Sequence, residues 1–170
     1  NRIAGNTAGT GGGSGIHNNG ATVNAGNNWW GCNAGPGSAP CDRSINASGT
    51  LTVAPHLTLR HTASPTTIVV GQTSTLTADF LQNSTAAAVA VGNLDAMIGT
   101  PIAFNAALLG TLSSAQTSIQ STGTATATFT GTSPGAGSAS STVDAQSVAA
   151  AITISKASTT TTITSDLPDP

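Results

Sequence analysis

Residues 124–130 read Thr-Ala-Thr-Ala-Thr-Phe-Thr, a strict alternation of hydroxyl-bearing and apolar side chains. Alternation with period two puts one kind of side chain on each face of a strand, so this stretch predicts a β-strand with one buried face. Threonine suits the outer face because its branched Cβ fits the pleat while its hydroxyl stays hydrated. Polar and apolar residues also alternate over residues 75–80, and Val148, Ala150, Ile152 and Ile154 form a further row of apolar residues at every second position.

The pattern extends outward from these stretches to most of the chain after residue 56. Turn-forming Gly, Pro and Ser residues separate the alternating segments. Many short strands without a helical segment to connect parallel neighbours predict an all-β, antiparallel β-sandwich. The Ala-rich segment 84–98 is weakly patterned, and we expect either a long loop or a short helical turn there. The predicted strands are 56–63, 66–70, 73–82, 101–107, 115–121, 123–131, 137–143 and 147–155.

Composition excludes several classes of function. The 170 residues include 4 Lys+Arg and 6 Asp+Glu, and the formal net charge is −2 at pH 7. Four basic residues are too few to neutralise a run of phosphates, and no nucleic-acid partner is expected. They are also too few to dock the chain on an anionic membrane. The longest apolar run, 86–91, is far shorter than the about 20 residues that span a bilayer, so no membrane insertion is expected. The chain starts at Asn1 without an apolar leader, and we expect a processed piece of a longer protein.

Residues 1 to about 50 follow a different pattern. Asn and Gly dominate, as in Asn18-Asn19-Gly20, and apolar residues are isolated, so no ordinary hydrophobic core is expected there. We therefore divide the chain into three parts: a terminal coil with a cysteine loop (1–55), a β-sandwich (56–156) and a linker with an unpaired strand (157–170).

Cys32 and Cys41 are the two cysteines of the chain, and they enclose a turn-rich loop that can bring two sulfurs together. We expect a structural disulfide, which for so short a loop contributes about 2–3 kcal/mol by chain entropy. The alternative is a pair of reactive or metal-binding thiols. Zinc would need two more ligands, and the three histidines show no matching spacing, so neither a metal site nor a cofactor is predicted.

Trp29 and Trp30 are adjacent, so on a strand they face opposite sides. We favour a hydrophobic lid that closes the end of the coil, because open solenoid ends need caps. The alternative is an exposed aromatic ring that stacks on a sugar. Asn46 and Asn83 each match the N-glycosylation pattern, and the Thr/Ser faces could carry O-glycans, but such short patterns also arise by chance in this composition.

Catalysis is not supported by the sequence. Glycosidases generally need paired carboxylates, and Asp42 is the only acidic residue before residue 60. Asp79, Asp95 and Asp144 lie on different predicted segments and are expected to be solvated, although one could join a calcium site with Asn93. No Gly-x-Ser-x-Gly elbow is present and no serine is placed to pair with His17, His56 or His61; His56 and His61 are expected at the start of the sandwich, facing the coil.

Two resemblances add to this interpretation. The order of the runs at 65–79, 99–104, 123–129 and 148–154 resembles the bacterial immunoglobulin-like domains of invasin- and intimin-type surface proteins, which implies an immunoglobulin-like sandwich over about 56–156. Asn1-Arg-Ile-Ala-Gly-Asn6 and Gly26-Asn-Asn-Trp-Trp-Gly-Cys-Asn-Ala-Gly-Pro36 are similar to the last coils of right-handed parallel β-helix repeats in secreted bacterial proteins. Only one or two coils are present, fewer than a stacked core needs.

The functional hypothesis is structural rather than enzymatic. We expect a subunit of an extracellular bacterial filament or cell-surface stalk, secreted and assembled from copies of itself by β-strand addition. The segment after Ile154 resembles the opening of a further immunoglobulin-like repeat, and its strand would pair with an edge of the next copy. The alternative is an adhesin fragment that binds carbohydrate or a host surface through the coil and its tryptophans. The residues expected in the inter-subunit strand are Thr159, Thr160, Thr161, Thr162, Ile163, Thr164 and Leu167.

Overall fold

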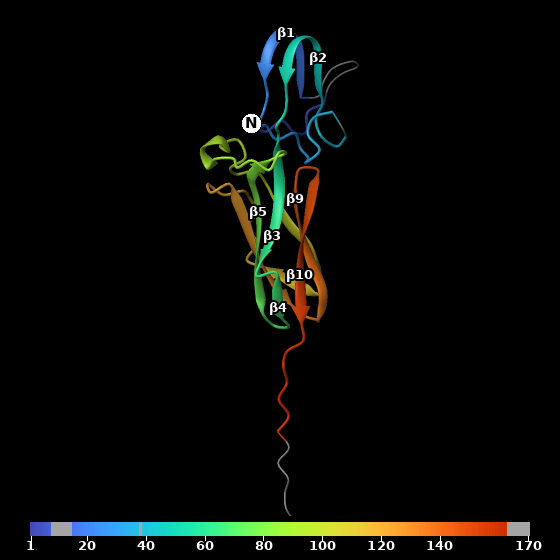
Figure 1. The fold of residues 1–170 in the computed structure, drawn as a ribbon, viewed down its shortest axis with the longest axis vertical. Helices are drawn as coiled ribbons and strands as arrows, with labels where there is room; N and C mark the ends of the chain where they lie inside the picture. The colour runs from blue at the N-terminus through green and yellow to red at the C-terminus, as the bar shows by residue number, and fades with distance from the viewer. Residues whose placement is uncertain (8–14, 38, 163–170) are drawn as a thin grey trace, which may run out of the picture.

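The computed structural model describes residues 1–7, 15–37 and 39–162, and over these it is all-β, with one short 3-10 helix and no α-helix. Its elements are β1 (Ile16–Asn24), β2 (Ser44–Thr52), β3 (Leu57–Ser64), β4 (Thr67–Val69), β5 (Thr73–Asn83), η1 (Val91–Asn93), β6 (Ala103–Leu108), β7 (Gly110–Ser113), β8 (Thr124–Gly131), β9 (Gly135–Val143) and β10 (Gln146–Ser155). Figure 1 shows them along one long axis, with β1 and β2 at one end.

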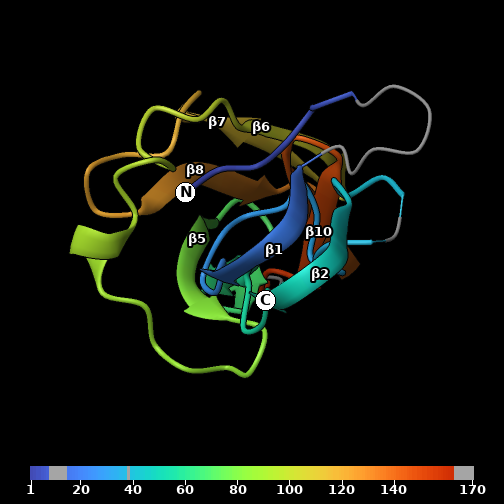
Figure 2. The same cartoon turned by 90° about the horizontal axis from the view of Figure 1, so that it is seen from above.

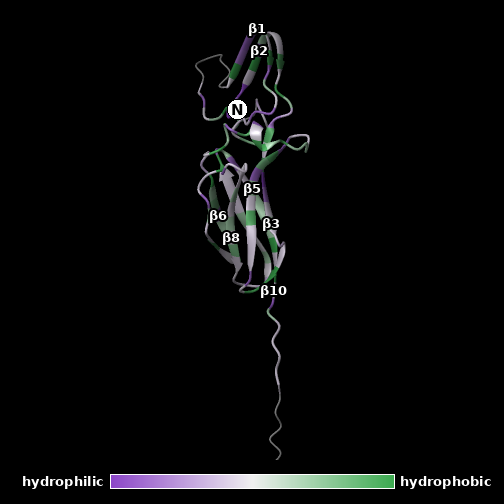
Figure 3. Cartoon of the chain, turned by 90° about the vertical axis from the view of Figure 1, so that its left-hand side faces the viewer, coloured by the Kyte–Doolittle hydropathy of each residue, from purple (hydrophilic) through white to green (hydrophobic). Residues whose placement is uncertain are grey.

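The strands from β3 onward form a sandwich of two four-stranded sheets, in the orders β3-β5-β8-β7 and β4-β10-β9-β6. All their pairings are antiparallel except that of β4 with β10. The alternation that predicted the fold is visible in β8, where Ala125, Ala127 and Phe129 are buried and the threonines between them are partly exposed. Figure 3 shows hydrophobic and more polar residues interspersed along the sandwich strands.

Two apolar clusters fill the sandwich from end to end. The cluster near the coil includes Phe80, Leu94 and Met97, and the cluster at the far end is centred on Phe129. Gly110 at the start of β7 is required by this packing, because a Cβ there would lie 2.2 Å from the Phe129 ring. The predicted antiparallel β-sandwich is therefore confirmed, with its apolar residues on the inner faces.

The predicted strand at 115–121 is wrong. Its place beside β8 is taken by β7, which pairs Gly110 with Gly131 and Ser113 with Thr128. Ser114 then adopts a φ of 49°, which ends the strand. Further on, the Gln116 side-chain oxygen accepts from the Thr126 amide, and Ile119 is buried in the core, so the segment follows the sheet edge without a continuous ladder.

The Ala-rich segment 84–98, expected to be a loop or a helical turn, contains both. It starts with a turn after Asn83, whose Oδ1 accepts from the amides of Thr85 and Ala87, and it includes the single turn η1. Two of its side chains, Leu94 and Met97, are almost fully buried in the sandwich core and anchor the loop.

The first 55 residues, where the resemblance implied coils like those of a parallel β-helix, contain a pair of regular strands. β1 and β2 pair in parallel, with Ile16 beside Ser44 and Asn24 beside Thr52, an offset of 28 residues. We call the described residues of 1–55 the coil unit. The expectation of no core was wrong in part, because Trp30, Ala25 and the two cysteines form a small buried cluster. Hydrogen bonds between polar side chains stabilise the remainder of this region. Asn18 Nδ2, for example, donates to Asn46 Oδ1 on the neighbouring strand at 2.8 Å.

The chain leaves the sandwich at the end opposite the coil unit. After Ser155, residues 156–162 form neither helix nor strand and are exposed, and Figure 1 shows them continuing the long axis away from β10. Figure 2, seen from above, shows β1 and β2 lying across the end of the sandwich strands. The exact boundaries of the three predicted parts stay a prediction.

Candidate functional site: the junction between coil unit and sandwich

The junction is built from three neighbouring backbone segments, at residues 1–3, 28–29 and 57, which are joined by hydrogen bonds. Trp29 donates its amide to the Asn1 carbonyl (2.9 Å) and its carbonyl accepts from the Ile3 amide (2.7 Å). On the other side, the Leu57 amide donates to the Asn28 carbonyl (3.0 Å). The first residue of β3 is thus also the last rung of the coil unit, so the coil continues directly into the sandwich.

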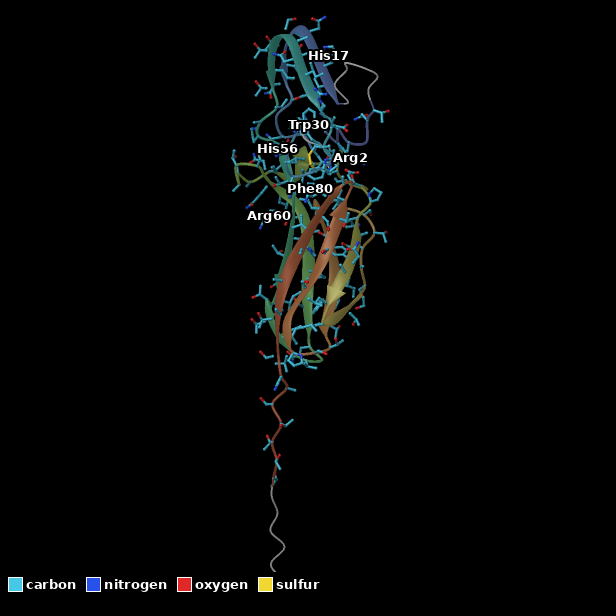
Figure 4. The ribbon with its side chains drawn as sticks, turned by 90° about the vertical axis from the view of Figure 1, so that its right-hand side faces the viewer. Arg2, His17, Trp30, His56, Arg60 and Phe80 are labelled. Carbon is cyan, nitrogen blue, oxygen red and sulfur yellow. A yellow bond between two sulfur atoms is a disulfide. The ribbon has the colours of Figure 1, made fainter. Side chains whose placement is uncertain are left out.

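Adjacent tryptophans join the two cores. Trp29 packs edge-on against Phe80 of β5, with ring centroids 4.9 Å apart, and belongs to the sandwich core. Trp30 belongs to the other cluster, with the two cysteines of the disulfide. Figure 4 shows Trp30 on the coil side of Phe80. Both side chains are 0% exposed. The proposed sugar contact of Trp29 and Trp30 is therefore wrong, because neither ring offers a face to a ligand; the interpretation as a hydrophobic closure fits their burial.

Asp144, in the turn between β9 and β10, is the polar centre of the junction. Its carboxylate accepts from Trp29 Nε1 at 2.7 Å and from Arg2 Nε at 3.1 Å, and it forms an ion pair with Arg2. The hydrogen bond and charge of Asp144 raise the pKa of Arg2 above its ordinary value. Beside it, the Ala145 amide donates to the Gly31 carbonyl (3.2 Å). This turn thereby connects the segments around Arg2 and Trp29 to the sandwich, although each of them is more than 110 residues away from the turn in sequence.

Asn33 joins the coil unit to β3 and β10. Its Oδ1 accepts from the Leu59 amide (2.7 Å) and its Nδ2 donates to the Leu59 carbonyl (2.9 Å), so one side chain extends the β3 ladder. Its own amide donates to Gln146 Oε1 (2.7 Å). His56 Nε2 lies 3.0 Å from the Asn33 carbonyl, which places His56 at the interface as expected. Gly35 is needed there, because a Cβ would lie 2.6 Å from the His56 ring.

The predicted disulfide is confirmed: Cys32 and Cys41 are bonded, with a Cα–Cα distance of 5.1 Å. Both cysteines are almost fully buried beside Trp30. The bond fixes the loop that carries Asn33, so it supports the junction from within the coil unit.

The two predicted glycosylation sites differ in their surroundings. Asn83 is 8% exposed, its Nδ2 donates to Asn27 Oδ1 (3.1 Å), and its Oδ1 holds the turn that follows. A glycan cannot be attached to this buried, bonded nitrogen, so the prediction at Asn83 is wrong for the folded chain. Asn46 is exposed, although its amide takes part in the ladder with Asn18 and Gly49, and its modification stays a prediction.

His61 lies inside the sandwich rather than at the coil. It is 7% exposed, its Nδ1 is 3.0 Å from the Val148 carbonyl, and its ring meets Phe104 edge-on at 5.5 Å. Burial lowers the pKa of His61 below its ordinary value, and the bond to Val148 opposes this only in part.

The candidate acidic residues do not come together. Asp79 is buried, with its carboxylate 3.9 Å from Arg60 and accepting from the Leu81 amide; Asp144 is in the junction; and Asp95 is on the loop after η1. Within 1–7, 15–37 and 39–162, no three His, Cys, Asp or Glu side chains are grouped as a metal site would need. In the same residues no helix has the length and apolarity to cross a membrane.

The predicted inter-subunit strand is described only in part. Thr159, Thr160, Thr161 and Thr162 are exposed and in no strand. Ile163, Thr164 and Leu167 lie outside the described residues.

No protein-family model matches this sequence, and no curated protein matches it significantly. Among solved structures, the chain is similar to the adhesin InvE of Yersinia pseudotuberculosis, with 28% identity and a TM-score of 0.44 over 59% of this chain and 28% of that one. It is also similar to the D0-D1 domain of intimin (22% identity, TM-score 0.42, 58% of this chain and 47% of that one). Domains 4 and 5 of the S-layer protein SbsC match with 14% identity and a TM-score of 0.40, over 62% of this chain and 56% of that one.

The fold shown by the chain's own strand pairing is a β-sandwich of two four-stranded sheets. The chain spans less than two thirds of each of these structures, and at such TM-scores the likeness supports no inference about activity or partners. The functional proposal therefore depends on the chain's own geometry.

The sequence alone did not indicate that Asp144 and Asn33 belong to the junction. Asp144 reads as an ordinary turn residue and Asn33 as one Asn among many, because their partners lie more than 25 residues away. One signal was available: charged residues make up only 6% of the chain, so each of them is a candidate for a specific contact.

Proposed function

We propose that this chain is a structural module of an extracellular bacterial stalk or filament, and not an enzyme. The observation that carries the proposal is the buried junction, where Trp29, Asp144 and Asn33 join the coil unit to the sandwich. A flexible connection would let the two parts bend, whereas bonds from both sheets of the sandwich to the coil unit favour a stiff rod. The coil unit and the chain's exit lie at opposite ends, which suits units joined in series (Figure 1).

The proposed assembly step is β-strand addition. Residues Thr159–Thr162 are exposed and threonine-rich, and threonine has a high propensity for strands. The two sheets leave β3, β7, β4 and β6 as edges, which carry backbone groups that a strand of another copy can bind. Low net charge supports close packing of many copies, because it limits their mutual repulsion.

Electron microscopy of the purified chain at neutral pH tests this proposal. The full chain should form long regular fibres, and a variant that lacks 157–170 should remain folded and monomeric. The matched control replaces 159–164 by alternating Gly and Ser, which keeps the length of the segment but removes its strand propensity. Fibres of normal appearance from either variant would refute strand addition, and dispersed monomers of the full chain would refute the filament.

A further inference from the structure

A polar pocket lies where the coil unit meets the loop that carries η1. Its volume is about 350 Å³, within the range of small-molecule sites. Residues 26–28 at a corner of the coil unit form one wall, and residues 92, 93, 95 and 96 of the loop form the other. In Figure 1 this loop (yellow-green) lies at the coil end of the sandwich, close to the N-terminus.

The loop side of the pocket is exposed but firmly held. Leu94 and Met97 are 0% and 1% exposed and sit in the sandwich core, while Asn93 and Asp95 on either side of Leu94 are exposed. Backbone bonds from the Leu94 amide to the Val91 carbonyl and from the Met97 amide to the Leu94 carbonyl fix the turn. Such anchoring lowers the entropy that a ligand must overcome, because the polar side chains project from a backbone that is already ordered.

The wall from the coil unit supplies an oriented amide. Asn27 has a φ of 54°, and its Oδ1 accepts from Asn83 Nδ2, so its own Nδ2 remains as a donor. Asn28 is already engaged: its Nδ2 donates to the Ala25 carbonyl, and its Oδ1 accepts from the α-amino group of Asn1, which also lines the pocket. No hydrogen bond within the described chain occupies the side chains of Asn93 and Asp95. The available groups are thus amide donors, an amide acceptor and one carboxylate.

This set of groups selects a chemical class of ligand. The lining has no Lys or Arg, and its one cationic group, the α-amino group of Asn1, already donates to Asn28 Oδ1. It also has no apolar side chain larger than that of Ala96 to bind a hydrophobic ligand. Amide and carboxylate groups together match the donor and acceptor pairs of neighbouring hydroxyls. We propose that this pocket binds a neutral sugar unit, with Asn27, Asn93 and Asp95 as hydrogen-bonding partners. The site is independent of the structural role proposed above.

Titration of the ¹⁵N-labelled chain in its unassembled form with neutral monosaccharides, disaccharides and polysaccharides, followed by amide chemical shifts, tests this site. Millimolar affinity is expected, because a few hydrogen bonds at an open pocket replace hydrogen bonds to water and each adds little net affinity. Saturable shifts should appear at residues 26–28 and 92–96. The double variant Asn93→Ala/Asp95→Ala should bind about tenfold more weakly or worse, because each lost bond costs several-fold in affinity. The control Asn105→Ala, an exposed amide on β6, should bind as the parent does.

A second variant blocks the pocket without removing a polar group. Gly92 has no positive φ and a Cβ there would meet nothing within 4 Å, so Gly92→Phe adds bulk without backbone strain and should abolish binding. The proposal is overturned if no neutral sugar gives saturable shifts, or if the double variant binds as tightly as the parent. Shifts at the same residues with CaCl₂ alone, and none with sugar, would also overturn it and assign the pocket to a cation.

Discussion

The substitution Asp144→Ala should be among the most damaging single changes in the chain, although Asp144 lies in a turn. The carboxylate accepts from the indole N–H of Trp29, which is fully buried, and from Arg2. Removing the acceptor leaves the indole N–H without a partner, at a cost of about 1–3 kcal/mol. Asp144 also has a φ of 51°, which Asp tolerates and Ala does not, at a cost of about 1 kcal/mol. The exposed part of the ion pair adds only about 0–1 kcal/mol.

Together these contributions predict a loss of about 2–5 kcal/mol in the free energy of unfolding, a large share of the about 5–15 kcal/mol of a typical domain. Urea denaturation followed by tryptophan fluorescence measures it. Asp144→Asn separates the contributions, because Asn tolerates the same φ and keeps an acceptor for Trp29, so it should lose only about 1 kcal/mol. Arg2→Ala should lose about 0–1 kcal/mol. If Asp144→Ala lost no more than Arg2→Ala, the buried hydrogen bond would not be the source of the junction's stability.

Three further predictions concern other parts of the chain. Reducing the bond between Cys32 and Cys41 should lower the free energy of unfolding by about 2–3 kcal/mol, measured by thermal melting with and without dithiothreitol; an unchanged melting temperature would contradict it. Because burial lowers the pKa of His61, the unfolded chain binds a proton more readily, so stability should fall as pH drops below about 6.5. Urea midpoints between pH 7.5 and 5 check this, and His61→Gln should flatten the profile. Gly110→Ala should cost about 1–3 kcal/mol because its Cβ collides with Phe129, and a variant of parental stability would show that the ring can move aside.

The sandwich could be predicted because its strands obey a local rule. In β8 and over residues 75–80 of β5 every second side chain is apolar, and burial of that row is sufficient to place the strand in a sheet. The failure at 115–121 has the same origin: Ile119 looks like part of an alternating row, but it reaches the core from an irregular segment. Alternation reports which side chains are buried, and it does not report whether the backbone beside them is paired.

The coil unit was only partly visible in the sequence because it is held by polar contacts. β1 and β2 have few buried side chains; one of them is Asn18, whose amide bonds to Ala21, Asn46 and Ser48 within and between rungs. A hydrophobicity pattern cannot detect such a ladder. The tryptophan pair was read correctly as facing two sides, but the presence of a second core on the other side could not be inferred from the adjacent residues.

The parallel pairing of β1 and β2 also limits how copies can be arranged. Neighbouring rungs of a parallel sheet are about 4.8 Å apart, so a copy that continued the ladder would be displaced sideways by only about 10 Å. The sandwich is wider than this, because its two sheets alone are about 10 Å apart and carry a further layer of side chains on each outer surface. Edge-to-edge growth through the ladder would therefore force the bodies of adjacent molecules into the same space. A partner on that edge must be slender, and bulky copies can meet only end to end.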